Sequence, residues 1–278
     1  MSAALKDGRV ARDLSDIDPG RRLAAIELIL SAQSEALSEP LSDDVLDALI
    51  RCVGAAQKTI QRRAIDALAL VAEVGDARVV ERLRKAIGDD DRRMRWGAAY
   101  ALGQIGAEAF AMDVADALSE ALSDDDGDIR WAAANLLVRL GREYPEEIRA
   151  RLIVLGTDSD HNARKMALYC IRDLGFAGAD LLAVLKHAVH DPDVHVRLAA
   201  LAVLTRLTDA SDAAAKLALE CLETDSDPGV RRAAAVALGN FHINSPRAAS
   251  ALRTAAADNT DTSLARAARG ALERLEKR

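Results

Sequence analysis

"MRWGAAYALGQIG" at residues 94–106 and "IRWAAANLLVRLG" at residues 129–141 are near copies of one another. In each stretch, small or aliphatic residues stand at positions −1, +3, +7 and +10 relative to the arginine. Because a helix turns by 100° per residue, this spacing places all of them on one face. The two stretches therefore predict the same amphipathic helix, used twice.

The arginine of these stretches marks a repeat that runs through most of the chain. Equivalent positions are separated by 40, 34, 35, 34, 33, 34 and 34 residues. The eight positions are Arg21, Gln61, Arg95, Arg130, Arg164, Arg197, Arg231 and Ala265. A second amphipathic stretch precedes many of these helices, as at residues 76–89, 111–124, 178–191 and 212–225. The repeating unit is thus predicted to be a helix A, a turn and a helix B, with the arginine in the first turn of helix B.

The turns before the B helices carry a shared acidic signal. Five units place aspartates six and four residues before the arginine, namely Asp89/Asp91, Asp124/Asp126, Asp158/Asp160, Asp191/Asp193 and Asp225/Asp227. An aspartate at this place accepts hydrogen bonds from the free N–H groups that begin a helix and favours its positive dipole end. We interpret the aspartates and arginines as structural, in helix caps and in hydrogen bonds between repeats.

The units resemble HEAT repeats, and in particular the short phycobilin-lyase-like subtype (E-Z type), whose pattern is an acidic turn followed by "VRxxAAxALGxIG". The match is carried by "DDDRRMRWGAAYALGQIG" at 89–106 and "DSDPGVRRAAAVALGNF" at 225–241. The resemblance implies an all-α fold, a right-handed α-solenoid (α-α superhelix) of about seven to eight stacked HEAT-like helix pairs. We expect one solenoid domain at residues 18–278 with a terminal capping helix, preceded by an N-terminal cap or frayed segment at residues 1–17.

Composition narrows the class of protein. Hydrophobic residues make up 50% of the chain and aromatic residues 3%, which favours close helix packing over a β-sandwich or barrel. Cys52, Cys170 and Cys221 form no CxxC pair, so neither a disulfide framework nor a zinc site is indicated. No apolar run reaches the ~20 residues that span a bilayer, and the start of the chain has no signal-peptide pattern. We expect a cytoplasmic protein without a membrane segment.

Positions +1, +5 and +9 of the B helices lie opposite the apolar face, and the resemblance implies that they line the concave groove. Both tryptophans and two of the three tyrosines fall on this strip, in three adjacent units. Exposed aromatic and arginine side chains are typical of hot spots for protein partners. "WAAAN" at 131–135 also resembles the Trp-x-x-x-Asn spacing of the armadillo repeats of importin-alpha, which implies contact with an extended peptide. The candidate partner-binding residues are Trp96, Tyr100, Gln104, Trp131, Asn135, Arg139, Lys165, Tyr169, Arg172, Arg206 and Arg232.

Two readings of the aromatic patch remain open, a binding site and packing between neighbouring helices. His187, His190 and His195 lie near two aspartates, but without a metal-binding signature they favour a solvated turn over a metal site. No phosphate-binding glycine loop or catalytic elbow occurs, so no catalytic residue or cofactor is predicted.

The leading hypothesis is a non-enzymatic scaffold or adaptor that binds a partner protein in its groove, through an acidic or extended segment. The first alternative, implied by the resemblance, is an accessory or lyase-type subunit that acts on a tetrapyrrole-bearing protein. The second is a nucleic-acid-binding HEAT-like protein. It is less favoured because the net charge is −7 and the acidic turns repel phosphates.

Overall fold

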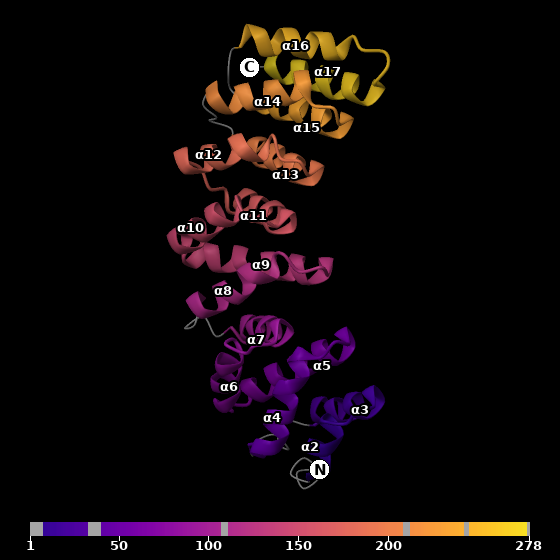
Figure 1. The fold of residues 1–278 in the computed structure, drawn as a ribbon, viewed down its shortest axis with the longest axis vertical. Coiled ribbons are helices and arrows are strands. Elements are labelled where there is room, and N and C mark those ends of the chain that lie inside the picture. The colour runs from indigo at the N-terminus through magenta and orange to yellow at the C-terminus, as the bar shows by residue number, and fades with distance from the viewer. Residues whose placement is uncertain (1–7, 33–39, 107–110, 208–211, 242–244, 277–278) are drawn as a thin grey trace. The chain divides into compact units, whose positions relative to one another are not determined.

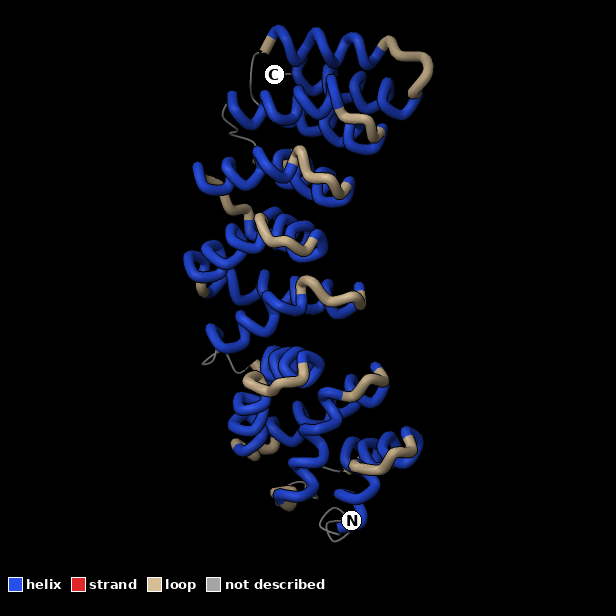
Figure 2. The backbone as a smooth tube through the Cα atoms, viewed as in Figure 1, coloured by secondary structure: helices blue, strands red, loops and turns tan. Residues whose placement is uncertain are grey.

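The computed structural model of the chain describes residues 8–32, 40–106, 111–207, 212–241 and 245–276. Every element in these ranges is a helix, and none of them is a strand (Figure 2). The chain divides into two compact units, Met1–Ala121 and Leu122–Arg278, which we call unit 1 and unit 2. None of the helices in the described ranges combines the length and the apolar character that crossing a bilayer requires.

Unit 1 is built from helix pairs in the predicted order. Its described helices are α2 (Gly8–Leu14), α3 (Pro19–Leu30), α4 (Asp43–Arg51), the short 3-10 helix η1 (Cys52–Gly54), α5 (Lys58–Glu73), α6 (Arg78–Ala86), α7 (Arg92–Ile105) and α8 (Ala111–Ala121). The B helices α3, α5 and α7 pack on one another in sequence, and α2, α4 and α6 each pack on the B helix that follows. The helix pairs predicted from the period are therefore present.

Unit 2 continues the same pattern. Its described helices are α9 (Gly127–Glu143), α10 (Pro145–Leu155), α11 (His161–Leu174), α12 (Ala179–Ala188), α13 (Val194–Leu204), α14 (Asp212–Thr224), α15 (Pro228–Asn240), α16 (Pro246–Ala256) and α17 (Thr262–Glu276). The B helices α9, α11, α13, α15 and α17 form one layer, and the A helices α10, α12, α14 and α16 form a second layer beside it (Figure 1). This is the α-solenoid arrangement expected of stacked repeats.

The core consists of the apolar face predicted from the repeat. In most repeats the residues at positions +3 and +7 are almost fully buried, as for Ala98 and Leu102 in unit 1 or Ala200 and Leu204 in unit 2. In the first repeat the buried face is shifted by one residue relative to Arg21, since Ala25 and Ile29 are buried while Leu28 is 37% exposed. Small residues permit close approach of neighbouring elements. At Gly97 of α7 the approach is closest, because a Cβ atom would lie 2.1 Å from the backbone oxygen of Val53 in η1.

Helix caps follow the predicted pattern. In five repeats the aspartate four residues before the arginine is the N-cap of its B helix, and its carboxylate accepts a backbone N–H of the first turn. The caps are Asp91, Asp126, Asp160, Asp193 and Asp227. At the other end, Gly106 and Gly175 close α7 and α11 with φ angles of 79° and 69°, in the left-handed region that favours glycine.

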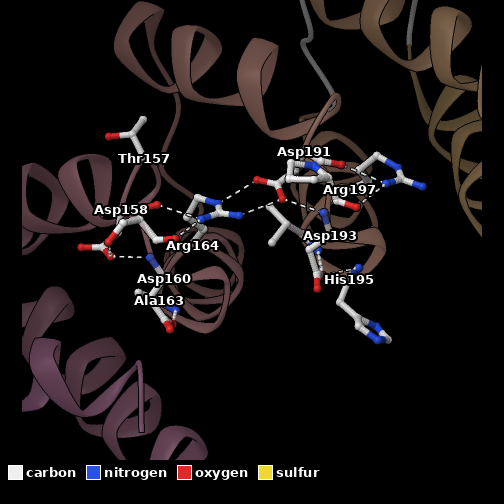
Figure 3. A network of polar contacts seen from close by, with 12 residues as sticks. Thr157, Asp158, Asp160, Ala163, Arg164, Asp191, Asp193, His195 and Arg197 are labelled. Carbon is white, nitrogen blue, oxygen red and sulfur yellow. Dashed lines mark hydrogen bonds and ion pairs between the residues drawn. The ribbon is translucent and has the colours of Figure 1, made fainter. Parts of the chain in front are cut away.

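In unit 2, repeat arginines join their own turn to the next one, and we call this arrangement the arginine–aspartate ladder. The Nη1 atom of Arg164 donates to the backbone oxygens of Asp158 at 2.8 Å and Ser159 at 2.9 Å, in its own turn. Its Nε and Nη2 atoms donate to both carboxylate oxygens of Asp191, in the following turn, at 2.7 and 2.9 Å. Figure 3 shows Arg164 directed at Asp191, with Arg197 placed in the same way one repeat further on.

The same arrangement recurs at Arg197 and, in part, at Arg231. Arg197 donates to the backbone oxygen of Asp191 at 2.9 Å and to the carboxylate of Asp225 at 2.9 and 3.2 Å. Arg231 donates to the backbone oxygen of Asp225 at 2.9 Å, and its side chain lies 3.9 Å from the carboxylate of Asp261. The predicted structural role of these residues, in caps and in hydrogen bonds between repeats, is confirmed.

In unit 1 the carboxylate partner of Arg95 is Glu120, in the last turn of α8, at 2.5 and 3.0 Å. The hydrogen bonds from Arg95 lower the pKa of Glu120 below its usual value of 4.5. A group whose folded-state pKa is lowered contributes stability above its unfolded-state pKa, and this stability is lost as the pH falls through the folded-state pKa. Because the Glu120 side chain is 41% exposed, the contribution is small.

We therefore expect the melting temperature of the native chain to fall more steeply below about pH 4.5 than that of a Glu120→Gln variant. Thermal melts followed by circular dichroism between about pH 6 and pH 3 measure the difference. Parallel curves for the two proteins would contradict this role of the Arg95–Glu120 pair.

Candidate partner-binding site

Three consecutive B helices of unit 2 present side chains to one small hollow. Arg130 and Trp131 come from the first turns of α9, and His195 comes from the first turn of α13. The hollow has a volume of about 230 Å³ and is lined by Arg130, Trp131, Lys165, Met166, Tyr169 and His195. Pockets for drug-sized ligands typically measure ~300–1,000 Å³, so this hollow is matched to a single side chain.

Trp131 and Tyr169 form one wall of the hollow. Their rings are stacked, with centroids 5.5 Å apart and an interplanar angle of 15°. The guanidinium carbon of Arg172 lies 4.9 Å from the centroid of the Tyr169 ring, as in a cation–π contact. Trp131 nevertheless keeps 49% of its surface exposed. The indole is thus held in one orientation while much of it remains available to a partner.

Arg130 differs from the other ladder arginines of unit 2. Its Nη1 atom donates to the backbone oxygen of Asp124, in its own turn, as Arg164 does with Asp158. Among the described residues, however, no carboxylate forms an ion pair with Arg130. Asp158, the equivalent of Asp191 in the following turn, accepts the backbone N–H of Asp160 at 2.8 Å. Arg130 thus lines the hollow, and among the described residues no carboxylate pairs with its guanidinium.

Lys165 is the second cation of the hollow, and it is partly desolvated. Its Nζ atom donates to the side-chain oxygen of Asn162 at 2.8 Å. Burial, followed by the positive charge of Arg130, lowers the pKa of Lys165, while the carboxylates of Asp193 and Asp160 act in the opposite direction. Two like charges thus share one hollow at a cost in free energy, which an anion between them would offset.

The remaining predicted residues of unit 2 lie outside the hollow. Asn135 and Arg139 are exposed on the next turns of α9, and Arg206 is exposed beyond the end of α13. Arg232 is half-buried on α15, where its Nη1 atom lies 4.0 Å from the carboxylate of Asp261. The structure therefore brings together Trp131, Lys165, Tyr169 and Arg172 from the predicted set, and separates the others along the B helices.

The predicted residues of unit 1 are Trp96, Tyr100 and Gln104, all on α7. Gln104 is exposed and Tyr100 half-buried, but Trp96 is only 5% exposed and lies against Tyr100 with centroids 5.0 Å apart. The expectation that both indoles are exposed is therefore wrong for Trp96. The helical spacing does not predict the 3-10 helix η1, which is not part of the repeat and which approaches α7 closely at Gly97.

Three lining residues of the hollow are not among the predicted site residues. The sequence pattern assigns Arg130 to the ladder only, gives no signal for Met166 and places His195 in a solvated turn. Within the described ranges, no group of three or more histidine, cysteine, aspartate and glutamate side chains is arranged to hold a metal ion. His190 lies 3.7 Å from Glu220, and only His195 of the three clustered histidines lines the hollow.

The difference between the two tryptophans is directly measurable. Trp131 is 49% exposed and Trp96 is 5% exposed. We expect acrylamide to quench the fluorescence of a Trp96→Phe variant, which retains Trp131, several-fold more strongly than that of a Trp131→Phe variant. Stern–Volmer plots of the two variants, with both quenched equally in denaturant as the control, make the comparison. Equal quenching of the two folded variants would contradict the assignment.

Comparisons with known proteins agree with the helical repeats. A family model described as HEAT repeats matches residues 42–137 and 181–273. No curated protein matches the chain in sequence. Importin beta is similar in structure, with a TM-score of 0.62, 16% identity and coverage of 97% of this chain and 40% of importin beta.

Two further solved structures are similar. A HEAT-like repeat protein from the archaeon Thermococcus onnurineus NA1 has a TM-score of 0.53 and 16% identity, with coverage of 86% of this chain and 98% of that one. The karyopherin Kap121p, bound to the extreme C-terminus of the protein phosphatase Cdc14p, has a TM-score of 0.61 and 13% identity, with coverage of 96% and 33%. The chain thus spans well under half the length of the karyopherins that it matches.

Proposed function

Because the chain belongs to the HEAT-repeat family, we propose that it is a protein-interaction scaffold that binds a segment of a partner protein on its B helices. Within the family, we place it in the short phycobilin-lyase-like (E-Z) subtype on its acidic turns and "VRxxAAxALGxIG" pattern. The observation that carries the proposal is Trp131, an indole fixed by stacking on Tyr169 yet 49% exposed.

Several features support a protein segment as the ligand. A large, rigid and exposed aromatic side chain beside arginines is the usual make-up of an interface hot spot, where a few residues carry most of the binding energy. The neighbouring Asn135 and Arg139 are exposed on the same helix and extend the surface beyond the hollow. The solved structure of Kap121p, which has a similar fold, holds the extreme C-terminus of another protein. An extended or terminal segment is therefore the kind of partner that we propose.

Site-specific photo-crosslinking tests this function. Benzoylphenylalanine at Asn135, one turn beyond Trp131, is expected to give a discrete adduct with a partner protein in the native host. The matched control is the same group at Val154, which is 70% exposed on the A helix α10. The adduct from position 135 should disappear when Trp131→Ala is added. Trp96 is left intact in this experiment, because removal of a buried indole creates a cavity and destabilises the fold.

Two outcomes would refute the proposal. One is an identical set of adducts from positions 135 and 154, which indicates non-specific contact. The other is an adduct from position 135 that survives Trp131→Ala while circular dichroism shows an intact fold.

A further inference from the structure

We propose that the hollow between α9, α11 and α13 binds the side-chain carboxylate of a glutamate or aspartate in the partner segment, with an apolar neighbour of that residue on Trp131. This inference rests on the proposed function and names the chemistry of the occupant.

The ladder itself provides the template for this carboxylate. Arg164 and Arg197 each receive a two-oxygen carboxylate from the following turn, through their Nε and Nη2 atoms. Arg130 uses its Nη1 atom in the same way as they do, on the backbone oxygen of its own turn. The carboxylate is the one component that the described residues do not supply to Arg130. A bound acidic side chain would complete for Arg130 the arrangement that Asp191 completes for Arg164.

Lys165 adds a second reason for an anion at this place. Its ammonium is partly buried, and it shares the hollow with the guanidinium of Arg130. Hydrogen bonds in which donor and acceptor are both charged are shorter and stronger than neutral ones, and partial desolvation strengthens them further. A single carboxylate between the two cations would satisfy both.

Size and shape restrict the occupant to one side chain. The volume of about 230 Å³ lies below that of pockets for drug-sized ligands, and the stacked rings of Trp131 and Tyr169 give it an apolar wall. The methylene stem of an acidic residue, or its apolar neighbour, would lie against this wall. The exposed part of Trp131 continues the apolar contact beyond the hollow.

The surrounding acidic groups favour a carboxylate in a peptide over a nucleic acid. The carboxylates of Asp160 and Asp193 lie close enough to raise the pKa of Lys165 against the effect of its burial. Nucleic acids carry a negative charge at every nucleotide, so a strand on the aromatic pair would also have to pass these aspartates and those of the neighbouring turns. A peptide segment can place a single negative charge at the two cations of the hollow and no further charges along the aspartates.

A selection experiment tests this inference even while the partner is unidentified. A random peptide library is selected on the intact chain, and the enriched peptides are measured by fluorescence polarisation together with versions in which each acidic residue is replaced by its amide. We expect enriched peptides to share an acidic residue next to an apolar one. Replacement of that acidic residue by its amide should weaken binding at least about tenfold, as the loss of a charge-assisted hydrogen bond implies.

Variants of the chain test whether Lys165 and Arg130 are responsible for the preference for acidic peptides. Lys165→Met and Arg130→Gln should each lower the affinity for the acidic peptides by about tenfold, to a value close to the affinity of the native chain for the amide versions. Arg253→Gln is the matched control, because it removes the same charge from an exposed position on the A helix α16 of the same unit, outside the hollow and outside the predicted binding residues. Thermal melts verify folding, and Lys165→Met keeps the test valid if Arg130→Gln destabilises its turn.

The outcomes separate the inference from the function on which it rests. The inference is wrong if Trp131→Ala abolishes binding of the selected peptides but neither the replacement of their acidic residues nor Lys165→Met changes their affinity. The proposed scaffold function would still hold in that case. If Trp131→Ala also leaves the affinity of the selected peptides unchanged, both the carboxylate inference and the proposed scaffold function are wrong. The inference is also wrong if a labelled oligouridylate binds more tightly than any selected peptide at the same ionic strength. That result would indicate a nucleic acid as the ligand.

Discussion

A Gly97→Ala variant is expected to lose about 3 kcal/mol of unfolding free energy in unit 1, the cost of overpacking a close contact. The added Cβ would lie 2.1 Å from the backbone oxygen and 2.8 Å from the carbonyl carbon of Val53. Neither atom belongs to a flexible side chain, so either η1 or α7 must move away. Urea unfolding followed by the fluorescence of Trp96, in a Trp131→Phe background, reports on this unit.

Gly270→Ala is the matched control for this substitution. Gly270 also lies inside a B helix, α17, but the nearest atom to an added Cβ is a guanidinium nitrogen of Arg274 at 3.9 Å. In open space alanine favours a helix over glycine by about 1 kcal/mol, so this variant should be slightly more stable than the native chain. Changes in unfolding free energy of opposite sign for Gly97→Ala and Gly270→Ala would support close packing of η1 on α7. An unchanged unfolding free energy for Gly97→Ala would contradict it.

The second large effect is expected at Asp191, the central carboxylate of the ladder. Its side chain is 7% exposed and that of its partner Arg164 is 14% exposed. Asp191→Ala would leave the buried guanidinium of Arg164 without its counter-charge and would remove the hydrogen bond that the N–H of Asp193 donates to the carboxylate of Asp191. Loss of one partner of a buried ion pair typically costs about 3–5 kcal/mol, and denaturant unfolding of the variant should show a loss of this size.

Asp89→Ala tests whether the loss of stability at Asp191 comes from the ion pair with Arg164 or from the hydrogen bond within the turn. Asp89 occupies the same repeat position and accepts the N–H of Asp91 at 2.8 Å. The preceding repeat has Gln61 in place of the arginine, so we expect a loss of only about 1 kcal/mol. Arg164→Met added to Asp191→Ala should recover part of the stability, since it removes the unpaired charge. Equal losses at Asp89 and Asp191, or no recovery in the double variant, would count against the ladder.

Most of the fold could be predicted because its determinants are local and repeated. The apolar face, the aspartate caps and the arginine of each turn recur at one period, so every repeat supplies independent evidence for the others. The close approach of η1 to α7 at Gly97 lies outside this pattern, and so does the burial of the adjacent Trp96, whose expected exposure is wrong.

The candidate site was only partly predictable. Trp131 and Tyr169 stand out as aromatic residues on an otherwise polar strip, and they do lie together. Nothing in the sequence signals that Arg130 lacks a carboxylate partner among the described residues, because Asp158 follows it by 28 residues, as Asp225 follows its partner Arg197. His195 lines the hollow although it lies two B helices beyond Trp131, and the sequence period alone does not predict this proximity.

The ladder makes neighbouring repeats interchangeable. Asp191 and Asp225 present the same acceptors one period of 34 residues apart. Excision of residues 192–225 would join Asp191 directly to the turn of Arg231, so that the backbone oxygen and the carboxylate of Asp191 keep an arginine each. A deletion that does not correspond to whole repeats would leave a guanidinium and a carboxylate without their partners at the junction. Genes for such arrays can therefore gain or lose whole repeats by unequal crossing-over without leaving a buried charge uncompensated.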